Sequence, residues 1–205
     1  MNMIRLYDKN NDLKKIAQIV AVLNDGGVII YPTDTTYALG CHALKERAVE
    51  RICKIKKIDP KKHPLSIVCH DLSEISRYAR VETFVYKSLK RNLPGLFTFI
   101  LPASKNLPKV FRNGSEREVG IKIQSRSLLN ELLESLGAPL MTASLPIDEQ
   151  EEPEYLTNAE LIEERFGDRV DIVIDGGEGT LGESTIVSYL EEEPQIIRQG
   201  LGILQ

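Results

Sequence analysis

Gly26 to Gly40, with the sequence GGVIIYPTDTTYALG, is the stretch that decides the fold of this chain. Its apolar run Val28 to Tyr31 predicts a buried strand, which Pro32 ends. Four polar residues follow: Thr33, Asp34, Thr35 and Thr36. After them, Tyr37, Leu39 and Gly40 have apolar and turn character. Open α/β sheets bind ligands beyond the carboxyl ends of their strands, so this polar cluster indicates a binding site. The alternative is a tight turn whose side chains cap only their own backbone.

Helical and strand patterns alternate along most of the chain on either side of this segment. Helices are predicted at 13–23, 44–57, from 71 or 73, at 82–91, 128–136 and 157–166, the last with a Thr157–Glu160 capping box. Strands are predicted at 28–31, 64–69, 97–101, 119–123, 139–144 and 170–174, with a final antiparallel ribbon of 185–189 and 195–198. A polar loop covers 102–118 and includes Asn113-Gly114. The pattern favours one three-layer α/β domain over residues 1–205, built on a twisted mixed sheet.

The bulk properties are those of a globular protein, with 205 residues, 42% hydrophobic and 27% charged. No apolar run reaches the length of a membrane span, and the polar first residues do not form a signal peptide. Three cysteines, Cys41, Cys53 and Cys69, stand far apart without a CxxC pair. This pattern favours reduced thiols in a cytoplasmic protein over a disulfide framework or a zinc site. We therefore expect no membrane partner and no protein-bound metal.

The formal charge of −4 conceals an uneven distribution. Eight acids lie in two short stretches, 148–154 and 191–193, and without them the chain carries 22 acids against 26 bases. Six of the bases fall within residues 51–62, against one acid there, Asp59. A solvated helix face explains any one of these lysines. As a cluster beside a polar strand end, they favour an anionic ligand.

Hydroxyl side chains recur where predicted strands begin or end, as at Thr98, Thr142, Ser144 and Ser184. Hydroxyls both donate and accept hydrogen bonds, so a converging set suits a small ligand with amine, carboxylate and hydroxyl groups. Three cations, Lys56, Lys122 and Arg198, could bind phosphate or carboxylate. Each of these residues has an ordinary alternative, because threonine favours strands and surface lysines are common. The chain contains no P-loop, GxGxxG or HExxH motif.

Six segments together resemble one known family: GGVIIYPTDTTYALG at 26–40, KIKK at 54–57, HPL at 63–65, PGLFTFIL at 94–101, STIVSY at 184–189 and IIRQG at 196–200. Their order and spacing are similar to those of the YrdC/YciO family over nearly the whole chain. The sequence motifs RICKIKK and TFILPASK resemble the YciO branch in particular. The resemblance implies a twisted α/β sheet around a concave, positively charged cavity.

Family members that are threonylcarbamoyl-AMP synthases convert L-threonine, bicarbonate and ATP to threonylcarbamoyl-AMP and pyrophosphate, for the threonylcarbamoyladenosine modification of tRNA. The resemblance therefore implies a nucleotidyltransferase that binds magnesium with ATP as a substrate complex and has no tightly bound cofactor. By position, Lys56 and Thr35 would be catalytic. The threonine pocket would contain Thr33, Thr36, His63, Thr98, Lys122 and Ser184, and the nucleotide would contact Lys56, Thr142, Ser144 and Arg198.

Three departures from the synthase pattern favour weak activity or an altered substrate. The Lys-x-Arg motif reads Lys56-Lys57-Ile58, and the Ser-x-Asn motif reads Thr142-Ala143-Ser144. Lys122 stands where synthases carry an arginine that grips the substrate carboxylate. A guanidinium supplies a fixed fork of donors that a lysine does not reproduce. Loss of such a partner costs about 1.5 to 3 kcal/mol, roughly tenfold to a hundredfold in binding.

Two other functions remain open from the sequence. The resemblance also implies double-stranded RNA binding on the concave basic face, although the chain is acidic overall and has no RNA-binding motif. A non-catalytic relative acting through protein partners, with the acidic stretch 148–154 as its contact, is the third reading. We expect a monomer or weak dimer.

Overall fold

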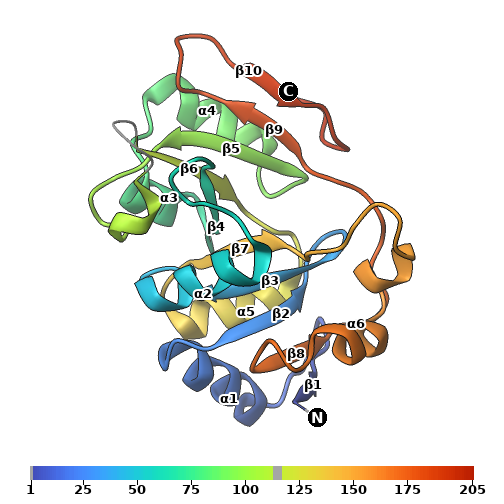
Figure 1. The fold of residues 1–205 in the computed structure, drawn as a ribbon. Coiled ribbons are helices and arrows are strands. Elements are labelled where there is room, and N and C mark those ends of the chain that lie inside the picture. The colour runs from blue at the N-terminus through green and yellow to red at the C-terminus, as the bar shows by residue number, and fades with distance from the viewer. Residues whose placement is uncertain (1, 113–116) are drawn as a thin grey trace.

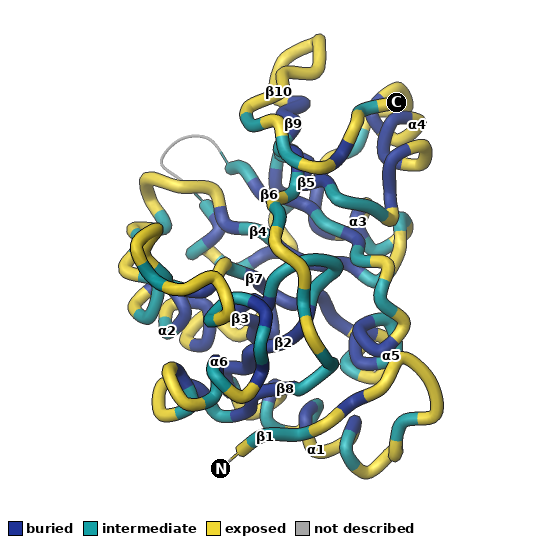
Figure 2. Tube along the Cα trace, turned by 90° about the vertical axis from the view of Figure 1, so that its right-hand side faces the viewer, coloured by how far each residue is buried: buried dark blue, intermediate teal, exposed yellow. Residues whose placement is uncertain are grey.

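Ten strands form one mixed sheet through the length of the molecule in the computed structural model, which describes residues 2–112 and 117–205 (Figure 1). The strands are β1 (Met3–Arg5), β2 (Val28–Pro32), β3 (Tyr37–His42), β4 (Leu65–Val68), β5 (Phe97–Pro102), β6 (Glu118–Lys122), β7 (Leu140–Ser144), β8 (Ile172–Asp175), β9 (Thr185–Ser188) and β10 (Gln195–Arg198). Their order across the sheet is β1-β8-β2-β3-β7-β4-β6-β5-β9-β10. The central strands are buried, whereas β10 at one edge is largely exposed (Figure 2). The predicted turn Asn113-Gly114 lies outside the described residues.

Helices cover both faces of the sheet, which confirms the predicted three layers (Figure 1). The helices are α1 (Leu13–Asn24), α2 (Glu46–Lys56), α3 (Leu72–Tyr78), α4 (Thr83–Asn92), α5 (Ser127–Leu136) and α6 (Ala159–Phe166), with two 3-10 turns, η1 (Lys109–Phe111) and η2 (Pro153–Leu156). Leucines and isoleucines of α1 and α5 pack on one face. The buried side chains of α2, α3, α4 and α6 join the core on the other face. None of these helices, within the part of the chain that the structure describes, is long and apolar enough to cross a membrane.

The segment that decides the fold forms an antiparallel hairpin of β2 and β3, with Ile29 opposite Gly40. The prediction of turn character after Tyr37 was wrong, because residues 37–42 form the strand β3. Every residue of β3 is buried, so no alternation of polar and apolar residues marks it in the sequence. The prediction also missed β1, a three-residue strand that pairs in parallel with β8.

Two helix termini carry caps of the residue types that favour them. Asp12 accepts a hydrogen bond from the Lys14 amide and caps α1, and Gly137 ends α5 in the left-handed conformation. The capping box assigned to Thr157 was wrong. Asn158 caps α6 instead, because its side-chain oxygen accepts hydrogen bonds from the Glu160 and Leu161 amides. Asparagine is one of the residues favoured at this position of a helix.

On one face of the sheet, the side chains change from apolar to polar half-way across the strands. Residues paired across neighbouring strands point to the same face, so Gly40, Thr142, Ser66 and Gly120 form one row on the face that α1 and α5 share. The apolar residues of this face, among them Ile29 and Tyr31, belong to the core under those helices. Thr142 and Ser66 instead line a cavity. The fold therefore leaves a polar strip of sheet open beside the covered one.

Candidate functional site

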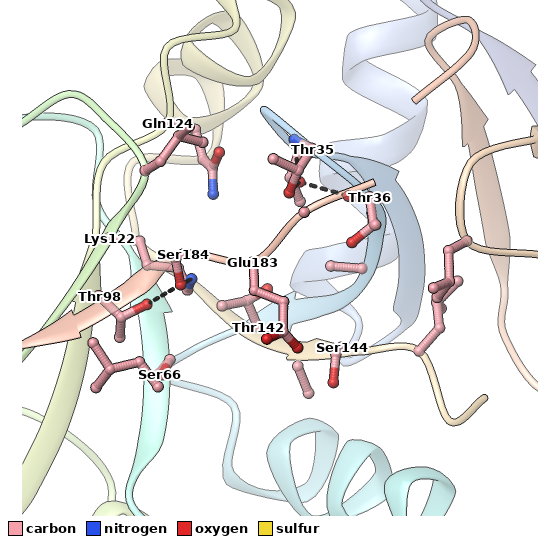
Figure 3. A pocket seen from close by; sticks show the side chains of 18 of the residues that line it. Thr35, Thr36, Ser66, Thr98, Lys122, Gln124, Thr142, Ser144, Glu183 and Ser184 are labelled. Atoms are coloured by element: carbon pink, nitrogen blue, oxygen red, sulfur yellow. Dashed lines mark hydrogen bonds between the residues drawn. The ribbon is translucent and has the colours of Figure 1, made fainter. Parts of the chain in front are cut away.

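A cavity of about 430 Å³ opens on this polar strip, within the range of small-molecule sites (Figure 3). Seven neighbouring strands, β3, β7, β4, β6, β5, β9 and β10, contribute residues to its walls. Its polar lining consists of Thr33, Thr35, Thr36, Lys56, Ser66, Thr98, Lys122, Gln124, Thr142, Ser144, Glu183, Ser184 and Arg198. The hydroxyl groups predicted to converge from distant parts of the chain therefore do share one hollow.

Two of the strands that line the cavity, β3 and β6, carry glycine at positions where a side chain would not fit. A Cβ atom at Gly120 would lie 2.4 Å from Ser66 Oγ and 3.0 Å from Thr98 Cγ2. A Cβ atom at Gly40 would lie 2.8 Å from the ring of Tyr31. That ring crosses Gly40, and its hydroxyl lies 2.6 Å from Thr142 Oγ1. Glycine in these two strands thus marks a close approach between neighbours.

The polar turn between β2 and β3 is held against the start of α5 by Asp34. Its carboxylate accepts hydrogen bonds from the backbone amides of Ser125, at 2.8 Å and 3.0 Å, and of Arg126, at 3.1 Å. The Asp34 amide in turn donates to Gln124 Oε1 at 3.0 Å. Asp34 is therefore a structural clamp, which leaves the neighbouring hydroxyls of Thr35 and Thr36 at the cavity wall (Figure 3).

Lys56, the last residue of α2, supplies the positive charge at one end of the cavity. Its Nζ donates to Ser144 Oγ at 2.7 Å and to the Leu145 carbonyl at 3.2 Å. Burial lowers the pKa of Lys56, because a charged amine loses part of its hydration there. These bonds fix the amine beside the carboxyl end of β7, where an anion could take up its remaining donor capacity.

Lys122 supplies the charge at the other end, within a cluster of hydroxyls (Figure 3). Its Nζ donates to Ser184 Oγ at 3.0 Å, and the same oxygen lies 2.9 Å from Thr98 Oγ1. Burial, together with the nearby positive charge of Arg198, lowers the pKa of Lys122 to about 8. This lysine therefore loses its proton at a lower pH than an exposed lysine does.

Arg198, on the edge strand β10, is bonded to Ser184. Its Nε and Nη2 donate to the Ser184 carbonyl at 3.2 Å and 2.9 Å, and Nη2 lies 3.5 Å from Ser184 Oγ. Its Nη1 lies 3.6 Å from the Glu183 carboxylate. The prediction grouped Arg198 with the nucleotide residues Lys56, Thr142 and Ser144. The structure instead joins it to the cluster of Lys122, Thr98 and Ser184.

Ser184 ends a glycine-rich segment, residues 176–184, which we call the strap. It connects β8 near one edge of the sheet to β9 near the other and runs down one side of the view in Figure 1 as an orange-to-red coil. The Thr180 amide donates to the Thr35 carbonyl at 3.0 Å, and the Leu201 amide to the Glu183 carbonyl at 2.9 Å. The end of the strap, from Leu181 to Ser184, lines the cavity.

Of the eleven residues singled out from the sequence, the structure brings ten to the cavity. They are Thr33, Thr35, Thr36, Lys56, Thr98, Lys122, Thr142, Ser144, Ser184 and Arg198. His63 is the exception, because it is exposed in the segment between α2 and β4 and is not part of the lining. We therefore do not retain it in the substrate pocket.

Sequence reasoning missed three polar lining residues, Ser66, Gln124 and Glu183. Ser66 interrupts the apolar run Leu65–Val68, which was the available signal. Gln124 directly follows the run predicted as a strand at 119–123. No feature of the strap indicated from the sequence that Glu183 would line the cavity.

The charges of the cavity favour an anionic ligand. Three cations, Lys56, Lys122 and Arg198, face one carboxylate, that of Glu183, among the described lining residues. Leu145, Ile147, Leu156 and Leu181 add an apolar wall. No group of three or more His, Cys, Asp or Glu residues in the described ranges could hold a metal ion.

A family model, Sua5_yciO_yrdC, described as "Telomere recombination", matches residues 21–200. The crystal structure of Escherichia coli YciO superimposes with a TM-score of 0.89 at 33% identity, covering 98% of this chain and 96% of that one. A Methanocaldococcus jannaschii protein named putative threonylcarbamoyl-AMP synthase is 32% identical over 203 residues, which are 97% of this chain and 93% of that protein.

A further similar structure is that of Pyrococcus abyssi Sua5 complexed with L-threonine. Its TM-score is 0.86 at 27% identity, and the match covers 98% of this chain and 58% of that one. These matches agree with the architecture described above, a mixed sheet with helices on both faces.

Proposed function

The chain belongs to the Sua5/YciO/YrdC family, and on that premise we propose that it is a nucleotide-binding enzyme of the threonylcarbamoyl-AMP synthase type. Its substrates would be L-threonine, bicarbonate and ATP, and its products threonylcarbamoyl-AMP, used in tRNA modification, and pyrophosphate. The observation that carries the proposal is the cationic cavity with Lys56 at one end and Lys122, Thr98 and Ser184 at the other.

The two ends of the cavity suit two different substrates. We assign L-threonine to the end formed by Lys122, Thr98 and Ser184 and by the turn that carries Thr35, because hydroxyls and an amine match a carboxylate, an amino group and a hydroxyl. L-threonine is the ligand of the related Pyrococcus abyssi structure, which supports this assignment. We assign the ATP phosphates to Lys56 and the neighbouring hydroxyls of Thr142 and Ser144.

The reaction has two steps in this proposal. The threonine nitrogen forms a bond to the carbon of bicarbonate with loss of water, which gives a carbamate. A carbamate oxygen then attacks the α-phosphorus of ATP, and the bond to pyrophosphate breaks. Magnesium enters as the ATP complex and shields phosphate charge. The residues of the cavity hold the carbamate and the phosphate in line, and Lys56 stabilises the charge that develops on the phosphate.

Three residues differ from the synthase pattern: Ile58, Ser144 and Lys122. We expect these differences to lower the rate of the reaction and not to change its class. Lys56 and Ser144 are joined by a 2.7 Å hydrogen bond, so the end assigned to the phosphates keeps a fixed amine and hydroxyl. A single ammonium at each end binds an anion with fewer directed donors than a guanidinium would. We expect slow turnover or a substrate other than threonine with the same amino-acid core.

The test is mass-spectrometric detection of threonylcarbamoyl-AMP from ATP, threonine and bicarbonate. Lys56→Ala removes the amine assigned to the phosphates and should weaken ATP binding by roughly tenfold to a hundredfold. Lys54→Ala, in the same helix but exposed, is the matched control and should leave ATP binding unchanged. A wild-type chain that neither gains thermal stability from millimolar MgATP nor forms an adenylate would refute the proposal. Steeply salt-dependent binding to duplex RNA in that event would favour the RNA-binding alternative.

A further inference from the structure

We propose that Gln124 is a specificity-determining residue, whose side-chain amide binds the carboxylate of the amino-acid substrate together with the Lys122 amine. The inference rests on the proposed function and deepens it, since it names a residue that selects the substrate. The resemblance to synthases implies a contact with the carboxylate at position 122 alone. Gln124 was not among the residues that the sequence singled out.

One end of the Gln124 amide is tied down, and the other end is free. The Asp34 backbone amide donates to Gln124 Oε1 at 3.0 Å. Only the oxygen of a carboxamide accepts a hydrogen bond, so this contact fixes which end of the group is which. Nε2, with its two hydrogens, makes no hydrogen bond within residues 2–112 and 117–205. Figure 3 shows this nitrogen directed toward the middle of the cavity.

Lys122 and Gln124 reach the cavity from the same stretch of chain. Lys122 is the last residue of β6, and Gln124 follows it by two positions. The residue between them, Ile123, is buried in the core on the other face of the sheet. Alternate residues of an extended chain point to the same side, and both Lys122 and Gln124 line the cavity. Their donors are therefore available to one ligand.

The charge of Lys122 has no carboxylate partner in the part of the chain that the structure describes. Its Nζ donates to Ser184 Oγ at 3.0 Å, and none of the ion pairs there includes it. An ammonium has three donors, so two remain for a ligand. Buried charges in proteins are normally paired, and this lysine is half-buried in the wall of an open cavity. An anionic group of the ligand would complete the pair.

A carboxylate needs more directed donors than one amine supplies. Its two oxygens offer about four acceptor positions, and a guanidinium fills two of them with a planar fork. The ammonium of Lys122 acts as a point charge on a flexible stem. The Gln124 amide adds a donor of fixed direction, which Asp34 holds in place before the ligand arrives. Lys122 thus supplies the charge, and Gln124 supplies the direction.

This arrangement should favour amino acids over amines that lack the carboxylate. L-threoninol keeps the amino group and the side chain of L-threonine but carries CH2OH in place of the carboxylate. It loses the charge partner of Lys122 and the strong acceptor of the Gln124 amide. We expect it to bind about a hundredfold more weakly than L-threonine to the wild-type chain.

The first experiment inverts the free end of the side chain and leaves the tied end intact. Gln124→Glu keeps an oxygen that accepts from the Asp34 amide but presents an acceptor where Nε2 was a donor. The Kd for L-threonine should rise about a hundredfold or more, whereas the Kd for L-threoninol should not rise. Proton NMR titration measures both constants, and the melting temperature without ligand reports on the fold.

Gln18→Glu is the matched control, because it adds the same charge at an exposed position of α1 outside the cavity lining. It should bind both ligands as the wild type does. An equal rise in Kd for L-threonine and L-threoninol in Gln124→Glu, or no rise for either, would overturn the inference. An equal rise would show that Gln124 only supports the turn at Asp34.

The second experiment makes Gln124 redundant. Lys122→Arg supplies both the charge and a fork of donors from one side chain. In that background Gln124→Ala should weaken L-threonine binding by less than about threefold, against roughly tenfold to a hundredfold in the wild-type background. Loss of the contact with Asp34 is common to both backgrounds and cancels. Equal losses in the two backgrounds would refute joint binding of the carboxylate.

Both experiments measure binding, so their outcome is separate from that of the adenylate assay. If the wild type binds L-threonine with the expected pattern and forms no adenylate, the proposed reaction fails and the carboxylate site stands. If the adenylate forms and Gln124→Glu binds L-threonine as the wild type does, the role of Gln124 alone fails. A wild-type chain that binds none of the standard L-amino acids at millimolar concentration would overturn both.

Discussion

Gly120, which pairs with the lining residue Ser66 across two strands, has no room for a side chain. An added Cβ there would meet Ser66 Oγ at 2.4 Å, so Gly120→Ala should force Ser66 to move and lower the free energy of unfolding by about 1 to 3 kcal/mol. Ser66→Ala removes the oxygen in the way, and the double variant Gly120→Ala/Ser66→Ala should regain most of the loss. Urea denaturation of the four proteins in this cycle measures the coupling. Strictly additive losses would show that the contact with Ser66 is not the cause.

Burial of Lys122 also makes stability depend on pH. Its pKa falls from 10.5 to about 8 on folding, so the unfolded chain binds more protons between these values and the free energy of unfolding should rise with pH across that window. Below pH 8 the full penalty applies. Lys122→Met should therefore stabilise the protein by about 1 to 3 kcal/mol at pH 7, and the gain should shrink as the pH approaches 10.

Thermal denaturation of wild type and Lys122→Met at several pH values measures this difference. Lys54→Met is the control, because this exposed lysine should change stability by less than about 0.5 kcal/mol at any pH. A constant difference between pH 7 and pH 10 would contradict the assigned cause.

Residue types alone indicated the chemistry of the cavity but not every position in it. Hydroxyls and cations at strand ends converge as expected, since neighbouring strands bring their ends together. Arg198 could not be placed with Ser184, because that contact depends on how far β10 runs along β9. His63 belongs to a segment with no regular pattern, so its sequence gives no direction for its side chain.

At the scale of elements, the turn of the β2–β3 hairpin depends on Asp34. Asp34→Ala removes the acceptor of the Ser125 and Arg126 amides and should lower the free energy of unfolding by about 1 to 2 kcal/mol. It should also weaken binding of the amino-acid substrate, because the turn carries Thr35 into the cavity wall.

Asp12→Ala is the matched control for Asp34→Ala. It removes the cap of α1, away from the cavity, and should cost a similar free energy without changing substrate affinity. Calorimetric titration of both variants separates the two effects. Equal affinities in Asp34→Ala and wild type would show that the clamp serves folding alone.

The elements that could be predicted from the sequence are those with a regular spacing of apolar residues or with a recognisable capping residue. α1 has both helical spacing and the Asp12 cap, and its start was predicted correctly. β3 lacks any period because both of its faces are buried, and Gly40 within it resembles a turn residue. β1 is only three residues long and depends on β8, which follows it by more than 160 residues.

At the scale of the whole molecule, the strap links two distant parts of the sheet across the cavity. Its residues are half-buried or exposed, and its hydrogen bonds to other backbone groups run to Thr157, Thr35 and Leu201. Segments of this kind open easily. We expect hydrogen exchange in the strap to slow when MgATP and threonine are bound, while exchange in β8 stays unchanged.

Hydrogen–deuterium exchange with mass spectrometry tests this expectation on the intact chain, with MgATP alone as the comparison. Unaltered exchange in residues 178–184 under conditions in which adenylate accumulates would show that substrate does not contact the strap. The strand order that places β8 and β9, which the strap connects, far apart in the sheet could not be predicted from the sequence, because pairing between distant strands leaves no local signal.

Ser66 and Thr142, the two members of the row that line the cavity, offer a means of redesign. Because β4 and β7 each contribute one short side chain to the lining, the depth of the hollow is adjustable in small steps at these two positions. A series of graded replacements there, balanced by trimming of a neighbour, could fit the protein to bulkier or smaller amino acids while both helical layers stay untouched.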